Sequence, residues 1–299
     1  MEKAIKCQQC GKEHIKKDGL RKTGNRGLIQ RYKCADCSHR FVLDEGFYRM
    51  RNSPQKITLC LDLFYRGVST RKVQEHLQAF YPHNSDHSTI LRWLWKYARQ
   101  ISGFTDSLKL NTGEEIQMDE VEYHRRKHHI RGGLDKNWLI DSIDPDTKFM
   151  VAAEFAKSRS ADKIKRVMEQ VKAKSDNVRM ITTDGLQAYP RVIKRVFGYN
   201  NKLRQHNVLH NKVVVSDGGS FNYPIERMHN SIRARTKTMR GFHGSVESAN
   251  LIIKGYEIYY NFITKHQSLN KCPYELATDL TLSSPNKWLE LIQMSKGRI

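Results

Sequence analysis

The chain has 299 residues, more than one average domain, so we expect two or three folded units. Lysine and arginine number 52 against 31 aspartates and glutamates, which gives a formal net charge of +21. Such a surplus repels itself in a compact fold unless a polyanion neutralises it, so nucleic acid is the expected partner and an anionic membrane the alternative. No stretch is apolar over the roughly 18–20 residues of a membrane span, and residues 1–10 lack a signal-peptide pattern. We therefore expect a cytoplasmic protein without a membrane partner.

Four of the six cysteines form two Cys-x-x-Cys pairs, which are Cys7 with Cys10 and Cys34 with Cys37. In an intracellular chain the thiols should be reduced, and four thiolates complete a tetrahedral structural zinc site. The 23 residues between the pairs (34 − 10 − 1) exceed the roughly 15–20 of the usual spacing, which a longer hairpin would accommodate. A redox-active Cys-x-x-Cys or unrelated buried thiols are the alternative. Cys60 and Cys272 stand alone and are not assigned as ligands.

Residues 1–45 are thus predicted to form a zinc-ribbon-like DNA-binding module. One zinc ion would stabilise a module whose apolar core is too small to fold by itself. The segment between the cysteine pairs is strongly basic and suited to contact phosphates, through Lys16, Lys17, Arg21, Lys22, Arg26, Arg31 and Lys33.

Residues 53–100 show the apolar periodicity of three helices. Pro54 suits the first turn of one helix, and Ser69 suits the N-cap of the next after a tight turn. A third helix is expected to start near residues 86–88 and to run to 98. We interpret the three as a helix-turn-helix domain whose third helix enters the major groove with Arg92 and Lys96 exposed. An ordinary three-helix bundle with a solvated basic face is the alternative, and residues 102–115 should separate it from the next unit.

The run from 115 to 124 alternates as a half-buried strand does, with Ile116, Met118 and Glu120 on one face. Asp119 then points to the opposite face, and Glu120, together with Glu122, should face away from it. A hairpin follows, with Asp141 and Asp144 in or near it as weaker site candidates, and then a helix over 160–174.

Asp184 ends the next short apolar strand and precedes Gly185, a position that suits a ligand site. Three hairpin strands, a helix and a strand that carries a second acid follow the order of an α/β fold with an RNase H-like mixed sheet. In that fold Asp119 and Asp184 lie on neighbouring strands. Carboxylates that converge there can hold two Mg²⁺ or Mn²⁺ ions about 3.5–4 Å apart.

A further helix is predicted from Pro224, and one of its faces carries Glu226, His229, Asn230, Arg233 and Lys237. We interpret Glu226 as a third acid of the site, and His229, Arg233 and Lys237 as contacts to DNA. The alternative is a solvated basic face in which Glu226 is only an ion-pair partner. The basic run 124–131 is another candidate to follow DNA.

Residues 114–277 resemble the core of insertion-sequence DDE transposases with a retroviral-integrase-like domain, which move by cointegrate formation. The resemblance rests on Met118-Asp119-Glu120 and on three longer segments, TTDGLQAYP, NYPIERMHNSIRARTKTMRGF and YYNFITKHQSLNKCPYELA. The last should pack against the core rather than take part in chemistry. Members commonly also carry a zinc ribbon and a helix-turn-helix, so the resemblance extends over nearly the whole chain.

This resemblance implies that Asp119, Asp184 and Glu226 are the catalytic residues and the ligands of two Mg²⁺ or Mn²⁺ ions. The 41 residues between Asp184 and Glu226 (226 − 184 − 1) exceed the usual family spacing, and the surplus should lie in the loop 202–220. Residues 278–299 are expected to be a short C-terminal tail.

The implied function is that of a transposase which binds the inverted-repeat ends of a mobile element and nicks them. The freed 3′-hydroxyls are then joined to target DNA by two-metal transesterification, without ATP or a covalent protein–DNA intermediate. The expected partners are the double-stranded DNA of the ends and target, and at least one further copy of the chain, in a prokaryotic nucleoid. A domesticated DNA-binding regulator that cuts nothing, and an RNase H-like nuclease or junction resolvase, are the alternatives.

Overall fold

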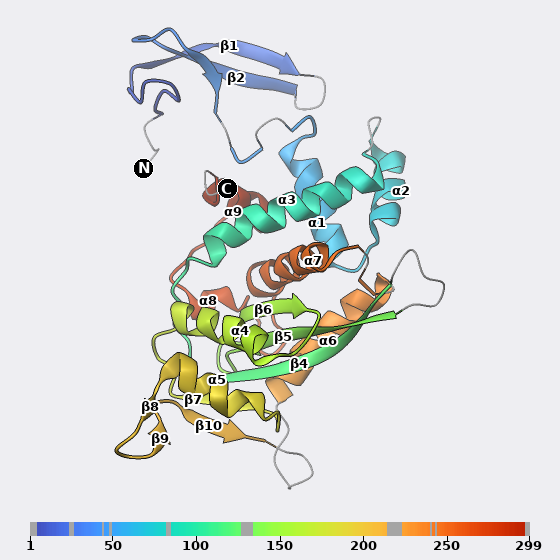
Figure 1. Cartoon of the computed structure of the whole chain (residues 1–299). Coiled ribbons are helices and arrows are strands. Elements are labelled where there is room, and N and C mark those ends of the chain that lie inside the picture. Colours follow the sequence, from blue (N-terminus) through green and yellow to red (C-terminus); the bar gives the residue numbers. More distant parts are fainter. Residues whose placement is uncertain are drawn as a thin grey trace.

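The computed structural model describes residues 5–23, 27–43, 45–47, 50–81, 85–126, 134–213, 223–239, 241–242 and 244–296. A small N-terminal sheet lies at one end of the molecule and a larger mixed sheet at the other, with the long helix α3 (His87–Thr105) and helix α7 (Val246–Ile258) between them (Figure 1). Among the described residues, no helix combines the length and apolarity required to cross a bilayer.

The N-terminal sheet is antiparallel and follows the chain order, with strands β1 (Ile15–Thr23), β2 (Gly27–Cys34) and β3 (Arg40–Val42). Its buried apolar cluster is small and separate from the main core, and consists of Cys7, Cys34 and Phe41. This small buried apolar surface cannot offset the chain entropy that is lost on folding. The N-terminal module therefore needs another source of stability.

Helices α1 (Pro54–Tyr65), α2 (Thr70–Phe80) and α3 follow. The side chains of their N-cap residues, Ser53, Ser69 and Asp86, each accept a hydrogen bond from a first-turn backbone N–H, at 3.2, 3.3 and 2.8 Å. Helix α3 continues to Thr105, past the boundary expected at residue 102. It does so because Ile101 and Phe104 extend its apolar face and are buried.

The main sheet has the strand order β10-β7-β4-β5-β6. Strand β5 pairs antiparallel with β4 and β6, whereas β7 pairs parallel with β4 and β10. This is the mixed sheet of an RNase H-like core, and the predicted fold class is confirmed. The strands are β4 (Glu115–Arg126), β5 (Leu134–Ile143), β6 (Met150–Ala156), β7 (Met180–Thr183) and β10 (Leu209–Lys212).

Strand β10 lies in a segment that we expected to be a loop, 202–220. Its sequence is mostly polar and exposed, so no alternation of apolar residues marks it as a strand. Pairing along β7, from Leu209 opposite Met180 to Lys212 opposite Thr183, gives it its extended form. The same segment contributes to a two-stranded ribbon of β8 (Tyr199–Asn200) and β9 (Gln205–His206). Much of the apparent surplus before Glu226 is therefore part of the fold.

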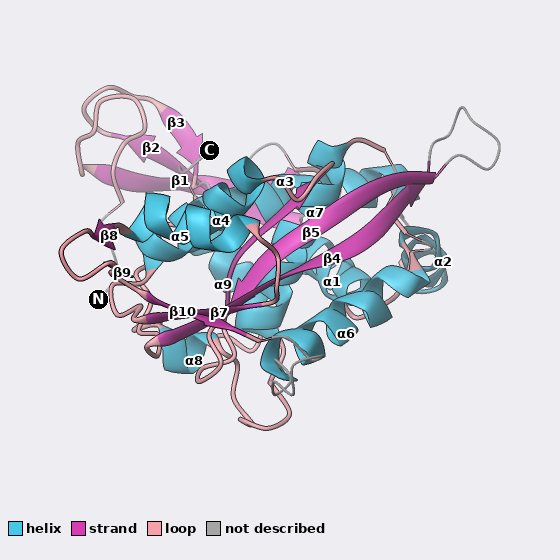
Figure 2. Cartoon of the chain, turned by 60° about the horizontal axis from the view of Figure 1, so that its bottom comes forward, coloured by secondary structure: helices cyan, strands magenta, loops and turns pink. Residues whose placement is uncertain are grey.

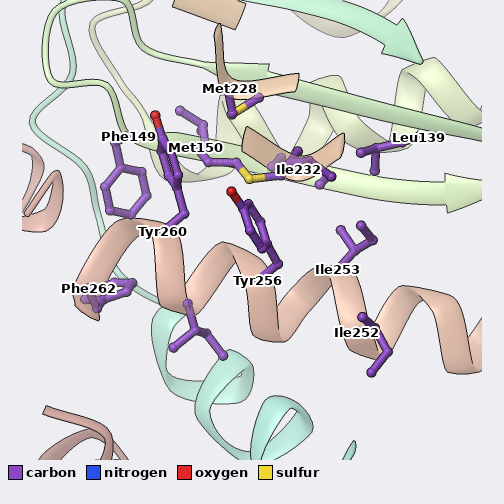
Figure 3. Close-up of a cluster of buried hydrophobic side chains, with 14 of the residues drawn as sticks. Leu139, Phe149, Met150, Met228, Ile232, Ile252, Ile253, Tyr256, Tyr260 and Phe262 are labelled. Carbon is purple, nitrogen blue, oxygen red and sulfur yellow. The ribbon is translucent and has the colours of Figure 1, made fainter. Parts of the chain in front are cut away.

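Helices cover both faces of the main sheet (Figure 2). Helices α4 (Ala161–Lys174) and α5 (Ala188–Phe197) lie on one side, and α6 (Tyr223–Thr238) lies on the other together with α7. Figure 3 shows Tyr256 of α7 and Tyr260 of the π-helical turn η2 (Tyr259–Ile263) beside Met150 of β6. Burial of both sheet faces makes this the principal core of the molecule.

Two asparagines cover the outer edge of β6. The Asn261 side chain accepts a hydrogen bond from the Met150 N–H and donates one to the Met150 carbonyl, both at 2.9 Å. Asn250 makes the same pair of bonds with Phe155, at 2.8 and 2.7 Å. These bonds satisfy backbone groups that an edge strand otherwise leaves open. The expectation that segment 259–277 packs against the core is confirmed.

After the short helix α8 (Tyr274–Ala277), the C-terminal segment forms helix α9 (Lys287–Met294). Helix α9 packs on α1 and α3, where Trp288 Nε1 lies 3.3 Å from Asp62 Oδ1 and Gln100 Nε2 donates to the Ile292 carbonyl at 3.0 Å. One continuous apolar cluster thereby includes α1 to α3, the main sheet and α9.

Candidate active site

The pairing of β4 with β7 determines where the first two acids lie. Strand β7 runs parallel to β4 with Glu115 opposite Met180 and Gln117 opposite Thr182. It ends at Thr183, whereas β4 continues to Arg126. If this register is continued for two more residues past Gln117 and Thr182, Asp119 lies opposite Asp184. The edge of β4 beyond Gln117 is therefore not covered by β7, and the acids meet at that opening.

Three carboxylates converge there. Asp119, Glu120 and Asp184 each offer an oxygen within 4.8 Å of the other two. The Glu120 N–H donates to Asp119 Oδ1 at 2.7 Å, and the Leu186 N–H donates to Asp184 Oδ1 at 2.9 Å. These backbone bonds orient the two aspartates, and the second oxygen of Asp119 lies 3.7 Å from His229 Nδ1.

The electrostatics of this cluster favour a bound cation. Burial raises the pKa of Asp119 to about 6, with contributions from the charges of Asp141 and Asp184 and against the opposing effect of His229. Burial likewise raises the pKa of Glu120 to about 7 against the opposing effects of Tyr189 and Arg159, and the neighbouring Asp184 and Asp119 add to the shift. Like charges held together in a desolvated site repel one another, and a divalent cation reverses that repulsion. Carboxylate oxygens are also the donors that Mg²⁺ and Mn²⁺ prefer, so these residues fit such an ion.

The prediction that Glu120 faces away from Asp119 was wrong for its carboxylate. The alternation along β4 is as expected, since Glu120 shares a face with the buried Ile116 and Met118 and lies near Tyr189 of helix α5. Because β7 does not pair with β4 beyond Gln117, the long Glu120 side chain still brings its carboxylate to Asp119 and Asp184. Strand alternation predicts the faces of a sheet but not which part of a strand lies at an open edge.

Glu226 lies in the first turn of α6 with its side chain exposed. Among the described residues, it is not a member of the carboxylate cluster. Residues 214–222, which lead into the helix, lie outside the described residues.

His229 does not lie where we predicted. It is 3% exposed, and its Nε2 is 2.8 Å from Oδ1 of the fully buried Asp141 on β5. It belongs to the buried face of α6 with Ile225 and Met228, so the prediction that it contacts DNA was wrong. His229 and Asn230 are adjacent polar residues between Met228 and Ile232, so the sequence did not show which of them lies on the buried face.

Arg233 and Lys237 are exposed on α6, and Arg92 is exposed on α3. The Arg92 side chain donates to Thr89 Oγ1 at 2.8 Å. Lys96 is only partly exposed, with its Nζ 3.5 Å from the Met50 sulfur. Most of the basic run 124–131 lies outside the described residues.

The four paired cysteines form a second cluster of ligand atoms, all within 4.8 Å of one another. Cys7 and Cys37 Sγ lie 3.5 Å apart, and Cys10 and Cys34 Sγ lie 3.6 Å apart, with none of the four in a disulfide. A tetrahedral zinc with bonds of about 2.3 Å has sulfur atoms about 3.8 Å apart. The cluster therefore fits a zinc ion, as predicted for a ribbon.

Acids that converge at the β4–β7 junction of an RNase H-like sheet suit metal-dependent phosphoryl transfer. Residues 130–267 match the family model DDE_Tnp_IS240, described as a DDE domain. This match supports a DDE-type insertion-sequence transposase, which would be a metal-dependent enzyme. The matched stretch includes Asp184 and Glu226 and begins after Asp119.

No curated protein matches the chain. Among solved structures, it is similar to the HTLV-2 integrase catalytic core domain in complex with magnesium, with 14% identity, a TM-score of 0.38, and coverage of 57% of this chain and 98% of that one. It is also similar to the Drosophila P element transposase strand transfer complex, with 9% identity, a TM-score of 0.35, and coverage of 87% of this chain and 80% of that one. The piggyBac transposase synaptic complex with hairpin DNA is similar with 10% identity, a TM-score of 0.36, and coverage of 85% of this chain and 71% of that one. At TM-scores this low, nothing about the chemistry of this chain follows from these likenesses.

Proposed function

We propose that this transposase binds the inverted-repeat ends of its element, nicks them to free 3′-hydroxyls and joins these to target DNA by direct transesterification. Cointegrate formation, which the sequence resemblance implies, belongs to the same proposal. The observation that carries it is the carboxylate cluster in which Asp119 and Asp184 meet where β7 ends beside β4. A binding-only regulator has no use for buried acids held together against their mutual repulsion.

In this proposal Asp119, Asp184 and Glu226 hold two Mg²⁺ or Mn²⁺ ions. When bound, such a pair lowers the pKa of the attacking water or hydroxyl and stabilises charge on the leaving oxygen. The chain itself contributes positioning, because the Glu120 and Leu186 N–H groups fix Asp119 and Asp184 before DNA arrives. Phosphoryl transfer of this kind needs orientation and charge stabilisation rather than a protein nucleophile.

Basic side chains on several elements would bind the DNA backbone. Arg233 and Lys237 extend along the exposed side of α6 away from Glu226, where they can neutralise phosphates near the site. We assign recognition of the element ends to the zinc ribbon (residues 1–45) and to the helix-turn-helix (53–100), with Arg92 on the exposed side of α3. The catalytic core is then 114–277 and the C-terminal tail 278–299. Since two ends must be joined at one target, at least two copies of the chain are expected to act together.

Strand transfer by an Asp184→Ala variant tests the proposal. With Mg²⁺, a donor end and a target duplex, we expect activity to fall at least about a hundredfold, because a ligand that stabilises the transition state is removed. Asp176→Ala is the matched control, since Asp176 is an exposed acid bonded to Lys109. Binding of an end duplex in a gel-shift assay should be retained by both variants. Full strand transfer by Asp184→Ala would contradict the assignment, and the absence of metal-dependent nicking by the unmodified protein would favour the regulator.

A further inference from the structure

We propose that Glu120 is a further metal ligand of this enzyme and coordinates the same divalent cation as Asp119 and Asp184. This inference rests on the proposal that the two aspartates hold such an ion. It adds a residue to the site that lies outside the three acids predicted from the sequence.

The Glu120 carboxylate is buried and has no hydrogen-bond partner. Its side chain is 0% exposed, and neither oxygen accepts a hydrogen bond within the described part of the chain. An ionised carboxylate in that state loses its hydration without compensation, at a cost of several kcal/mol. Its neutralisation therefore requires either a proton or a cation in direct contact.

Among the described residues, the one ion pair of Glu120 is long and exposed to solvent on its cationic side. The nearest guanidinium contact is Arg159 Nη1, which lies 4.0 Å from Glu120 Oε2, beyond hydrogen-bond distance. The Arg159 guanidinium is instead placed over the Trp138 ring, 4.4 Å from its centroid, and its side chain is 42% exposed. On the other side Tyr189 of α5 is fully buried, and Glu120 raises its pKa further after the effect of burial. Arg159 and Tyr189 therefore offset the Glu120 charge only in part, and among the described residues neither makes a hydrogen bond with its oxygens.

The direction of the carboxylate supplies the remaining argument. Asp119 comes from the α6 face of β4, Glu120 comes from the α5 face, and Asp184 comes from the end of β7, yet one oxygen of each lies within 4.8 Å of the others. A strand residue that only packed beneath α5 would have no reason to bring its carboxylate to two further acids. Oxygen donors that approach one point from three directions are what a hard cation requires. Glu226, exposed and outside this cluster, is then free to serve the second ion.

Direct titration with Mn²⁺ tests the inference without any assay of activity. The full-length protein, loaded with zinc, is titrated with Mn²⁺, and free Mn²⁺ is measured by electron paramagnetic resonance. We expect Glu120→Gln, which keeps the shape of the side chain, to raise the Mn²⁺ Kd at least about tenfold. Loss of a mere outer-shell partner already costs that much. Glu122→Gln is the matched control, because Glu122 lies on the same strand, two residues on, and is exposed and ion-paired with Lys136.

Asp184→Asn separates failure of this inference from failure of the proposed metal site. If Asp184→Asn loses Mn²⁺ and Glu120→Gln binds it as the unmodified protein does, Glu120 is not a ligand and the proposed function stands. If Asp184→Asn also binds normally, the metal site itself is wrong. Should Glu120→Gln not fold, Glu120→Asp takes its place: a shortened carboxylate should bind Mn²⁺ more weakly, and unchanged binding would overturn the inference. Circular dichroism melts without Mn²⁺ report on folding.

Discussion

His229 of α6 lies between two acids of the sheet. Its Nε2 is 2.8 Å from Asp141 Oδ1 on β5, and its Nδ1 is 3.7 Å from Asp119 Oδ2 on β4. Burial lowers the pKa of His229, but the charges of Asp141 and Asp119 outweigh that effect, so its pKa is raised. The histidine thus links the helix that carries Glu226 to the strand that carries Asp119.

We expect His229→Ala to destabilise the fold by about 3 kcal/mol, because it leaves the fully buried Asp141 carboxylate without its partner. The other Asp141 oxygen has no hydrogen bond among the described residues, so no second contact compensates. Urea denaturation measures the loss. Asn230→Ala, at the next and exposed position of the same helix, should change the unfolding free energy by less than about 0.5 kcal/mol.

A double-mutant cycle distinguishes this pairing from simple loss of packing. Asp141→Ala combined with His229→Ala should cost clearly less than the sum of the two single changes, since the double variant buries neither charge. Additive losses would mean that His229 contributes only its volume.

The zinc ribbon should depend on its metal independently of the rest of the chain. Its apolar cluster is separate from the main core, so loss of zinc should unfold the ribbon alone. We expect Cys34→Ser to lose zinc and to become sensitive to protease within residues 5–43, while tryptophan fluorescence reports an unchanged melting transition. All four tryptophans lie outside the ribbon, at positions 93, 95, 138 and 288.

Cys60→Ala should destabilise the main core and leave the zinc ribbon unchanged, the reverse of Cys34→Ser. Cys60 is buried in α1 within the main core and lies outside the cysteine cluster. This variant should retain zinc and a protected ribbon while its main transition moves to lower temperature. A Cys34→Ser protein that keeps zinc at unchanged stoichiometry would rule out the four-cysteine site.

The sequence predicted those parts of the molecule whose signals are local. Alternation over 115–124 and the acid at the end of a short apolar strand were enough to place Asp119 and Asp184 on neighbouring strands. The spacing of the four cysteines was enough to predict that their sulfur atoms come together. Helix boundaries followed where a capping residue marked them, as Ser69 does for α2.

The remaining features depend on tertiary structure. Glu120 reaches the cluster only because β7 is shorter than β4, and β10 forms only because β7 offers it a partner. His229 is buried because an aspartate 88 residues earlier in the chain lies opposite it. None of these three relations can be read from the residues that surround these positions in the sequence.

The stability of the protein should depend on pH through a buried ion cluster at the base of α3. Asp106 lies 2.7 Å from Lys174 Nζ and 3.1 Å from Lys254 Nζ. Burial raises the pKa of Asp106, but the charges of Lys254 and Lys174 lower it by more, so its pKa is lowered in the folded state. The folded value thus lies below the unfolded value of roughly 3.9.

The stabilising contribution of Asp106 is present above about pH 4 and is lost as the pH falls through the folded-state pKa. We therefore expect the unfolding free energy, followed by tryptophan fluorescence, to decrease between about pH 5 and 3 more steeply in the unmodified protein than in Asp106→Asn. Asp176→Asn removes an exposed acid paired with Lys109 and should alter the slope much less. Equal slopes for all three proteins would exclude Asp106 as the source.

Arg233 and Arg235 lie two residues apart on α6, and we expect Arg235 to contribute to stability and Arg233 to DNA binding. Arg235 is 6% exposed, its guanidinium carbon lies 4.0 Å from the centroid of the Phe64 ring on α1, and burial lowers its pKa to about 10. Arg233 is exposed. We expect Arg235→Ala to lower the unfolding free energy by about 2 kcal/mol, through loss of the desolvated cation–π contact and of packing between α6 and the helical layer.

Arg233→Ala should leave the unfolding free energy within about 0.5 kcal/mol and weaken binding to an end duplex. If Arg233 neutralises one phosphate, the slope of log binding constant against log salt should become shallower by about 1. Arg235→Ala, measured where it remains folded, should keep the original slope. An unchanged slope and affinity for Arg233→Ala would remove it from the DNA interface, whereas a changed slope for Arg235→Ala would mean that DNA binding exposes that buried side chain.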